Sequence, residues 1–72
     1  MKVKFEVEAH RSGRWYASGK IRYKGQTYLI LTDGESFEEL VDMVKDAIKE
    51  AFDSEGLKSP PVDIVLEYRF TL

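Results

Sequence analysis

The chain has 72 residues, a net charge of −2 and no cysteine, which excludes disulfides, thiolate metal sites and thiol nucleophiles. A chain of this length forms one domain, residues 1–72, and buries only about 60% of its unfolded surface, so we expect a homo-oligomer. No apolar run reaches the roughly 18 residues that cross a bilayer and the N-terminus lacks a signal core, so we expect a cytoplasmic protein without membrane contact.

Three strands are predicted in the first 32 residues. Apolar residues alternate with polar ones over residues 2–9, which is the period of a strand with one buried face. After the turn at Arg11-Ser12-Gly13, the odd-numbered residues of 15–23 continue the inward-facing set. Lys24-Gly25 is a tight turn into a third strand, Gln26 to Thr32. Because both connections are too short for a crossover, the three strands form an antiparallel meander.

A helix follows from about Phe37 to Phe52. Asp33-Gly34 is predicted to be a turn, and Ser36 with Glu39 forms a capping box that fixes the start of the helix. Gly56 is predicted to end the helix, after Ser54 and Glu55. One face carries apolar residues at helical spacing and is predicted to be buried. These residues are Phe37, Leu40, Val41, Val44, Ile48, Ala51 and Phe52.

The last strand, which follows the stiff Pro60-Pro61 connector, is predicted to reach Leu72. Its even-numbered residues from Val62 face one way and the odd-numbered ones face the other. A right-handed helical crossover places this fourth strand parallel to the first. The prediction is an α+β domain of order β-β-β-α-β, with one four-stranded sheet in the order 3-2-1-4. The single helix covers one sheet face and leaves the other open.

The sequence provides no convincing catalytic group. His10 is the only histidine, and the serines have no evident base partner. The strand order resembles the front part of the ribonuclease H fold, whose members hold two metal ions with carboxylates. Glu6, Glu8, Glu39 and Asp63 are the residues available for such a site, but Glu6 and Glu8 belong to the open sheet face and Glu39 belongs to the cap. We therefore expect no enzyme activity, no metal and no cofactor.

The third strand carries the strongest surface signal, because the run Tyr28-Leu29-Ile30-Leu31 is apolar on both faces of a sheet-edge strand. Either Leu29 and Leu31 or Tyr28 and Ile30 enter the core, and the other pair projects outward. An edge strand with projecting apolar side chains is a binding surface for a second strand or subunit. The residues predicted to form a partner or oligomer interface are Tyr16, Tyr28, Leu29, Ile30 and Leu31.

Nucleic acid is a second candidate ligand for the open face. Lys20 and Arg22 are predicted to share that face with Tyr16 and Tyr28, and bases stack on sheet aromatics in RNA-binding modules. The net negative charge and the absence of a helix-turn-helix or an RNA-binding sheet motif argue against direct nucleic-acid binding.

Two segments carry a resemblance to a known family. Residues 13–18, Gly-Arg-Trp-Tyr-Ala-Ser, are similar to the aromatic second strand of the HicB-like antitoxin family. Residues 32–40, Thr-Asp-Gly-Glu-Ser-Phe-Glu-Glu-Leu, are similar to its helix-start motif. The Asp46-Ala47-Ile48 run and the Pro60 link extend the similarity over nearly the whole chain. The shorter connection at Tyr23–Gln26 departs from the family pattern.

The resemblance implies a non-catalytic domain with a partial ribonuclease H-like fold that pairs with itself and sequesters a small toxin ribonuclease. Because the chain contains no DNA-binding domain, operator binding is not implied. Two alternatives remain open. One is an oligomeric β-sheet binding module, with or without RNA. The other is a designed α+β protein without a biological function, because the helix is nearly idealised.

Overall fold

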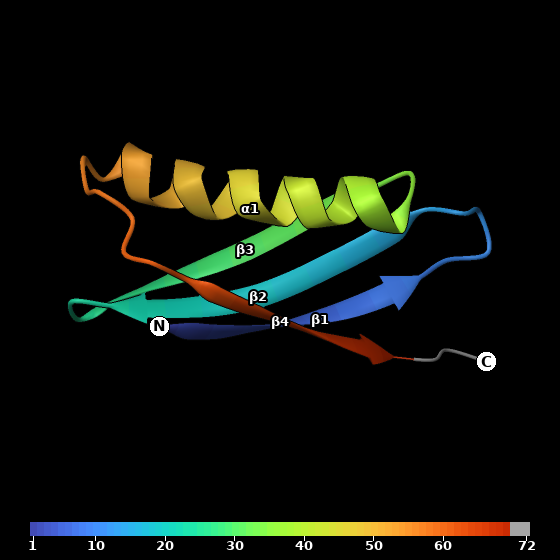
Figure 1. Cartoon of the computed structure of the whole chain (residues 1–72), viewed down its shortest axis with the longest axis horizontal. Coiled ribbons are helices and arrows are strands. Elements are labelled where there is room, and N and C mark those ends of the chain that lie inside the picture. Colours follow the sequence, from blue (N-terminus) through green and yellow to red (C-terminus); the bar gives the residue numbers. More distant parts are fainter. Residues whose placement is uncertain (70–72) are drawn as a thin grey trace.

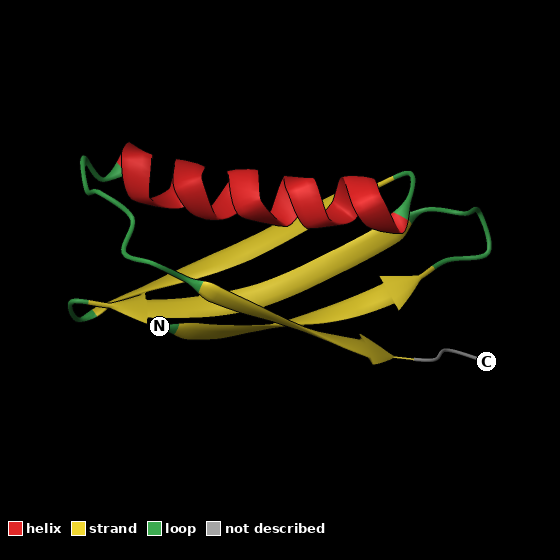
Figure 2. Cartoon of the chain, in the orientation of Figure 1, coloured by secondary structure: helices red, strands yellow, loops and turns green. Residues whose placement is uncertain are grey.

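The computed structural model describes residues 1–69 and shows a four-stranded sheet with one helix packed across it (Figure 1). The elements in chain order are β1 (Lys2–Ala9), β2 (Trp15–Tyr23), β3 (Gln26–Gly34), α1 (Phe37–Ser54) and β4 (Asp63–Arg69). The sheet order is β3-β2-β1-β4, with β4 parallel to β1 and the other neighbours antiparallel. The predicted element order and strand order are therefore confirmed. Figure 2 shows the two layers, with the helix on one side of the sheet.

The two hairpin turns lie where the sequence places them. Lys24 and Gly25 both have positive φ, 50° and 78°, as a two-residue hairpin that matches the strand twist requires. The turn between β1 and β2 is closed by the His10 N–H, which donates to the Arg14 carbonyl at 2.8 Å. These turns fix the register of the meander, in which Phe5 lies opposite Gly19 and Gly19 lies opposite Ile30.

The predicted turn at Asp33-Gly34 is wrong, because both residues extend β3. Asp33 lies opposite Tyr16 and Gly34 lies opposite Trp15. The Arg14 Nε donates to a carboxylate oxygen of Asp33 at 3.1 Å, and this cross-strand contact holds Asp33 in the ladder. A side chain at Gly34 would lie 2.8 Å from the backbone nitrogen of Leu40, so the helix start approaches too closely for any residue but glycine.

Both helix ends have the capping that the sequence predicts. The Glu39 N–H donates to the Ser36 Oγ at 3.1 Å, which is the serine half of the capping box. At the other end, Leu57 N–H donates to the Phe52 carbonyl and Gly56 N–H donates to the Asp53 carbonyl, both at 3.0 Å, with Gly56 at φ 69°. This is a Schellman motif, and it extends the helix two residues beyond the predicted end.

The fourth strand is aligned with the first by a ladder of ion pairs. Lys4 lies opposite Val65 and Glu6 lies opposite Glu67, so each charge pairs diagonally. Lys4 Nζ lies 2.5 Å from a carboxylate oxygen of Glu67, and an Arg69 guanidinium nitrogen lies 3.3 Å from one of Glu6. A one-residue slip of β4 would move these charges to the other face of the sheet. The predicted continuation through Phe70 and Leu72 lies outside the described residues.

The core lies between α1 and the sheet, but the helix covers only part of the inner face. Four helix residues are buried, and α1 packs on β3 and β2. The inner side chains of β1 are buried as well, whereas Ile64 and Leu66 of β4 are only half-buried. The helix therefore lies on one face of the sheet, as predicted, and leaves the inner face of β4 half-buried. The buried residues are Val3, Phe5, Val7, Ala17, Ile21, Ile30, Leu40, Val44, Ile48 and Phe52.

Candidate protein interaction surfaces

The outer strand β3 presents two leucines to solvent. Leu29 is 75% exposed and Leu31 is 80% exposed, whereas Ile30 between them is 5% exposed. The pleat explains this contrast, because successive side chains point to opposite faces of the sheet. Among the described strands, only β2 pairs with β3, so the other backbone edge of β3 has no strand partner. The exposed pair of the apolar run is therefore Leu29 and Leu31.

Two of the predicted interface residues lie on the covered face. The Tyr28 ring packs against Phe52 of α1, with ring centroids 5.5 Å apart, and Ile30 belongs to the core. The predictions that Tyr28 shares the open face and that Ile30 forms the contact are wrong. The register of the hairpin is the physical cause, because it places Tyr28 opposite the buried Ile21.

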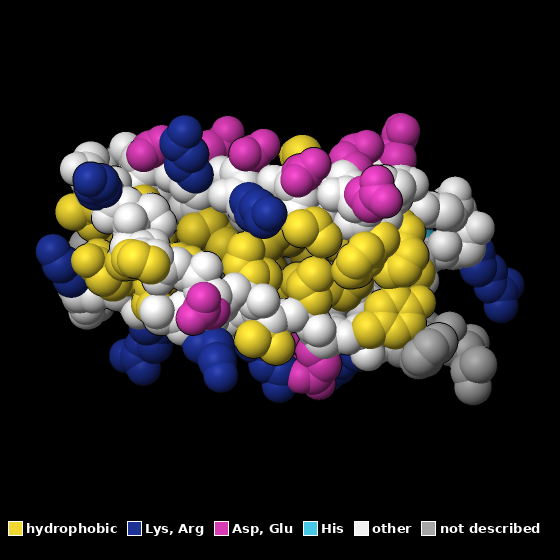
Figure 3. Space-filling model, viewed as in Figure 1, with side chains coloured by type: hydrophobic (Ala, Val, Ile, Leu, Met, Phe, Trp, Pro, Cys, Tyr) yellow, Lys and Arg dark blue, Asp and Glu magenta, His cyan; other side chains and the backbone are white. Residues whose placement is uncertain are grey.

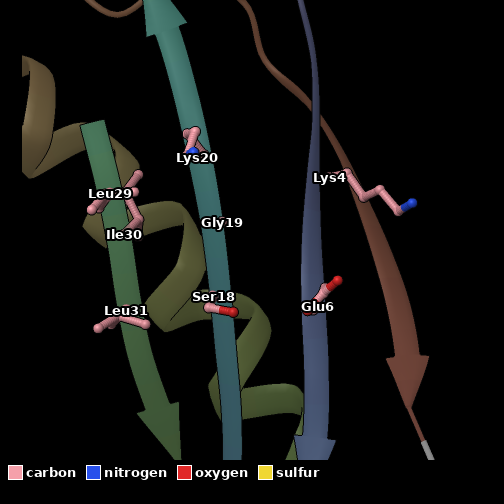
Figure 4. A pocket seen from close by; sticks show the side chains of 8 residues that line it. All are labelled: Lys4, Glu6, Ser18, Gly19, Lys20, Leu29, Ile30 and Leu31. Atoms are coloured by element: carbon pink, nitrogen blue, oxygen red, sulfur yellow. The ribbon is translucent and has the colours of Figure 1, made fainter. Parts of the chain in front are cut away.

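The exposed leucines form one wall of a shallow hollow on the open face. The hollow has a volume of about 500 Å³. In Figure 4, Leu29 and Leu31 project from β3 beside Ser18 and Lys20 of β2. Lys4 and Glu6 of β1 form the other side. The hollow therefore joins an apolar strip at the sheet edge to a charged centre.

The charges on the open face balance. Among the described residues this face carries five cations (Lys2, Lys4, Lys20, Arg22, Arg69) and five carboxylates (Glu6, Glu8, Asp33, Asp63, Glu67). Tyr16 is 39% exposed there, and its ring centroid lies 4.6 Å from that of His10, with the two ring planes tilted by 59°. The predicted nucleic-acid residues Lys20 and Arg22 do share the face with Tyr16. The neighbouring carboxylates, however, offset these positive charges, so the face attracts phosphate groups only weakly.

Ion pairing changes the proton affinity of three groups on this face and its rim. The hydrogen bond from Lys4 lowers the pKa of Glu67 below its ordinary value, and the same bond raises the pKa of Lys4. The hydrogen bond to Asp33 raises the pKa of Arg14, whose guanidinium also lies 3.7 Å from Glu35. Because these groups are exposed, the pairs contribute to strand alignment more than to net stability.

A second apolar surface lies between α1 and β4. A groove of about 320 Å³ is lined on one side by Val41, Val44 and Lys45 of the helix. Its other side is formed by Val62, which precedes β4, and by Asp63, Ile64 and Leu66 of β4. A smaller hollow of about 170 Å³ continues it past Ile48 and Lys49 to Pro60. Figure 3 shows a continuous band of apolar side chains below the helix on this side of the molecule.

Aromatic side chains close one end of this groove. The Trp15 ring lies 5.4 Å from Phe37 at the start of α1 and 5.6 Å from Tyr68 of β4, measured between ring centroids. Phe37 is 44% exposed, although its spacing predicts burial. The partial cover by α1 explains this, because Phe37 and Val41 lie on the side of the helix that faces the groove rather than β3.

The carboxylates of the nuclease alternative are not brought together. Glu6 and Asp63 face the open side of the sheet, whereas Glu39 is on the helix across the core. In residues 1–69, no group of three or more histidine, cysteine or acidic side chains is clustered to hold a metal ion. Within the same residues, no helix has the length and apolar character needed to cross a membrane.

No protein-family model matches this chain, and no curated protein matches it in sequence.

The groove between α1 and β4 was not predicted from the sequence. One signal for it exists in the sequence: the apolar arc of the helix extends through Phe37 and Val41, beyond the width that two strands need. Lys45 and Lys49 lie beside that extended arc, at the i, i+4 spacing that puts both side chains on one helix face. The counterpart of this arc is the half-buried inner face of β4, Ile64 and Leu66.

Proposed function

We propose that this chain is a non-catalytic protein-interaction domain that pairs with a second copy through β3. The exposure of Leu29 and Leu31 on an edge strand is the observation that carries this proposal. Exposed apolar edges are ordinarily blunted by charges, proline or a covering segment, because they pair with other strands. In β3 the open-face residues at the centre of the strand are both leucines.

The sequence of β3 is complementary to itself in an antiparallel arrangement. A two-fold axis at Ile30 places Leu29 opposite Leu31 of the partner subunit, and the reverse contact follows by symmetry. Four leucines then form one apolar cluster across the new strand boundary, where side chains directly opposite lie about 5 Å apart. The backbone groups along the outer edge of β3 gain hydrogen-bond partners in the same step.

Charge supports the antiparallel orientation. The hairpin end of β3 lies beside Lys24 of the turn and Arg22 of β2, whereas its other end carries Asp33 and is followed by Glu35, which both contact the cation Arg14. Antiparallel pairing brings the basic end of one copy beside the acidic end of the other. Parallel pairing would place like charges together, which is unfavourable.

Sedimentation equilibrium from roughly 1 to 500 µM tests this pairing. The parent is expected to form a dimer, and Leu29→Lys/Leu31→Lys is expected to be a monomer with an unchanged far-UV circular dichroism spectrum. Val65→Lys is the matched control, because Val65 is also apolar, 41% exposed and on an edge strand, but on β4. A monomeric parent across this range, or a double variant that dimerises like the parent, would contradict the proposal.

The resemblance to HicB-like antitoxins supports a specific role, the sequestration of a small ribonuclease toxin. The test is a growth assay in which a small ribonuclease encoded beside this gene is induced with and without the chain. Growth is expected to be restored by the parent and by Glu6→Gln, since sequestration needs no carboxylate chemistry. Continued arrest, or a neighbouring gene whose product has no ribonuclease activity, would contradict the antitoxin role without affecting the dimer.

RNA is the alternative ligand, favoured by the shared position of Tyr16, Lys20 and Arg22 on the open face. Single-stranded RNA bound there would stack on Tyr16 and would be released by salt. Electrophoretic retention of RNA that falls steeply with ionic strength and disappears in Lys20→Glu/Arg22→Glu would favour this alternative over a protein partner.

A further inference from the structure

We infer that the groove between α1 and β4 is the docking site for an amphipathic helix of a partner protein, with carboxylates on the flank that faces α1. This inference does not depend on pairing through β3, since the groove lies on the β4 side of the sheet. The occupant is defined by three properties of the site: its place above the sheet, its width and its charge.

Backbone chemistry selects a helix over an extended peptide. The floor of the groove is the inner face of β4, whose backbone is already hydrogen-bonded to β1 within the sheet. An extended segment lying over side chains would leave its own N–H and C=O groups without partners in an apolar site. A helix satisfies those groups internally and presents only side chains. The side chains that meet it are Val41, Val44, Ile64 and Leu66.

The dimensions agree with this choice. The molecule measures 38 × 17 × 16 Å, and α1 lies over β3 and β2. The inner side chains of β1 are already buried, so the strand left for a second helix is β4; a helix about 10 Å wide, placed beside α1, would pack over its inner face and complete the layer. The 18 residues of α1 correspond to roughly 27 Å, or about five turns, so a partner helix of about four turns fits within the length of α1.

The described residues of this chain do not supply that helix. Their single helix is α1, and its apolar stripe is already buried in the core of its own subunit. The described residues of a second copy therefore have no free apolar helix face to offer, and we assign the occupant to a partner protein.

The charged residues of α1 beside the groove determine which charge the facing side of the partner helix carries. Lys45 lines the groove and Lys49 lines the hollow that continues it, and these two lysines of α1 are one helical turn apart. The acidic residue in the lining, Asp63, lies on the opposite wall at the start of β4, so the wall formed by α1 is the basic one. A partner helix with two glutamates at i and i+4 would place a carboxylate beside each ammonium group. Such rim contacts add little affinity but discriminate between partners of opposite charge.

Two synthetic 16-residue peptides, free of tryptophan and tyrosine, provide the probe. Both carry leucines at i, i+3, i+4 and i+7 and differ only at one i, i+4 pair on the flank, Glu in one peptide and Lys in the other. Trp15 is the only tryptophan of the chain and lies at the end of the groove, so its fluorescence reports binding. The Glu peptide is expected to bind the parent about tenfold more tightly than the Lys peptide at low salt.

The Lys45→Glu/Lys49→Glu variant is the decisive comparison, because both side chains are exposed and the change leaves the apolar floor intact. The preference is expected to reverse, with the Lys peptide becoming the tighter ligand. A matched pair on the same helix controls for surface charge. Val41→Asp, in the groove, is expected to abolish binding, whereas Met43→Asp, which lies outside the groove residues, is expected to leave it unchanged.

Three outcomes would overturn the inference. They are no binding of either peptide to the parent, an unchanged peptide preference in the Lys45→Glu/Lys49→Glu variant, and equal loss of binding in Val41→Asp and Met43→Asp. If Val41→Asp fails to fold by circular dichroism, the reversal of preference remains as the test. Loss of the β3 dimer in Leu29→Lys/Leu31→Lys with peptide binding retained would separate this site from the proposed self-pairing.

Discussion

Replacing Gly19 by alanine is expected to destabilise the domain, although glycine is a poor strand residue. Gly19 lies opposite Phe5 in the β1–β2 ladder, and both residues face the core. A Cβ at position 19 would lie 2.7 Å from two ring carbons of Phe5 and 2.9 Å from a third. Carbon atoms prefer separations of about 3.5–4.0 Å, so the ring must move by roughly 1 Å.

The size of the effect follows from two opposing terms. Removing glycine from a strand interior stabilises by about 0.5–1 kcal/mol, because the unfolded chain has less freedom to lose. Overpacking a core costs about 1–3 kcal/mol, and Phe5 is fully buried. The steric term is the larger, so we expect a net loss of about 1–2 kcal/mol and a melting temperature lower by roughly 5–15 °C.

Calorimetry and urea unfolding at one fixed protein concentration measure this loss. The double variant Gly19→Ala/Phe5→Leu provides the control, since the new methyl group occupies space that the smaller side chain vacates. Its cost is expected to be smaller than the sum of the two single costs by at least about 0.5 kcal/mol. An unchanged or raised melting temperature in Gly19→Ala, or strict additivity in the double variant, would refute the close contact between Gly19 and Phe5.

Three further predictions concern the cap, the ion-pair ladder and chemistry. Ser36→Ala removes the acceptor of a backbone N–H in the first turn of α1 and is expected to cost about 0.5–2 kcal/mol in thermal or urea unfolding, whereas an unchanged stability would exclude the cap. The Lys4–Glu67 pair is expected to raise the melting temperature relative to Lys4→Met/Glu67→Gln at neutral pH. That difference should vanish as the pH falls through the lowered pKa of Glu67, and again as it rises through the raised pKa of Lys4. With Mg²⁺ or Mn²⁺ we expect no cleavage of RNA or of an RNA–DNA hybrid, and cleavage by the parent that disappears in Glu6→Gln/Asp63→Asn would contradict a non-catalytic domain.

The fold could be predicted from the sequence because several local signals agree. Alternation defines three of the strands, Lys24-Gly25 defines the hairpin, and Ser36 with Gly56 delimits the helix. The handedness of crossovers then leaves one strand order, which the structure has. The turn predicted at Asp33-Gly34 was wrong, because the same dipeptide can also end a strand. The ion pair between Asp33 and Arg14, which is distant in sequence, favours the strand here.

The orientation of β3 was left open because its central run is apolar at every position. The register resolves it: a two-residue turn at 24–25 pairs Tyr23 with Gln26, so that Ile21 pairs with Tyr28. Because residues directly opposite share a face, the buried side of β2 fixes Tyr28 and Ile30 as the inner pair. The turn type therefore contains the information that alternation within β3 lacks. For the α1–β4 groove the extended apolar arc of the helix is a weaker signal, because the groove depends on how far one helix reaches across four strands.

The two proposed surfaces are compatible in one assembly. Pairing through β3 uses one edge of the sheet, and the strand order places β4 at the opposite edge. In a two-fold dimer the two β3 strands meet at the centre of an eight-stranded sheet, so each groove between α1 and β4 lies at an outer end. Two partner helices could then bind without contacting each other or the dimer interface. Because each site is separate, the peptide affinity of the parent should be independent of protein concentration across the monomer–dimer transition.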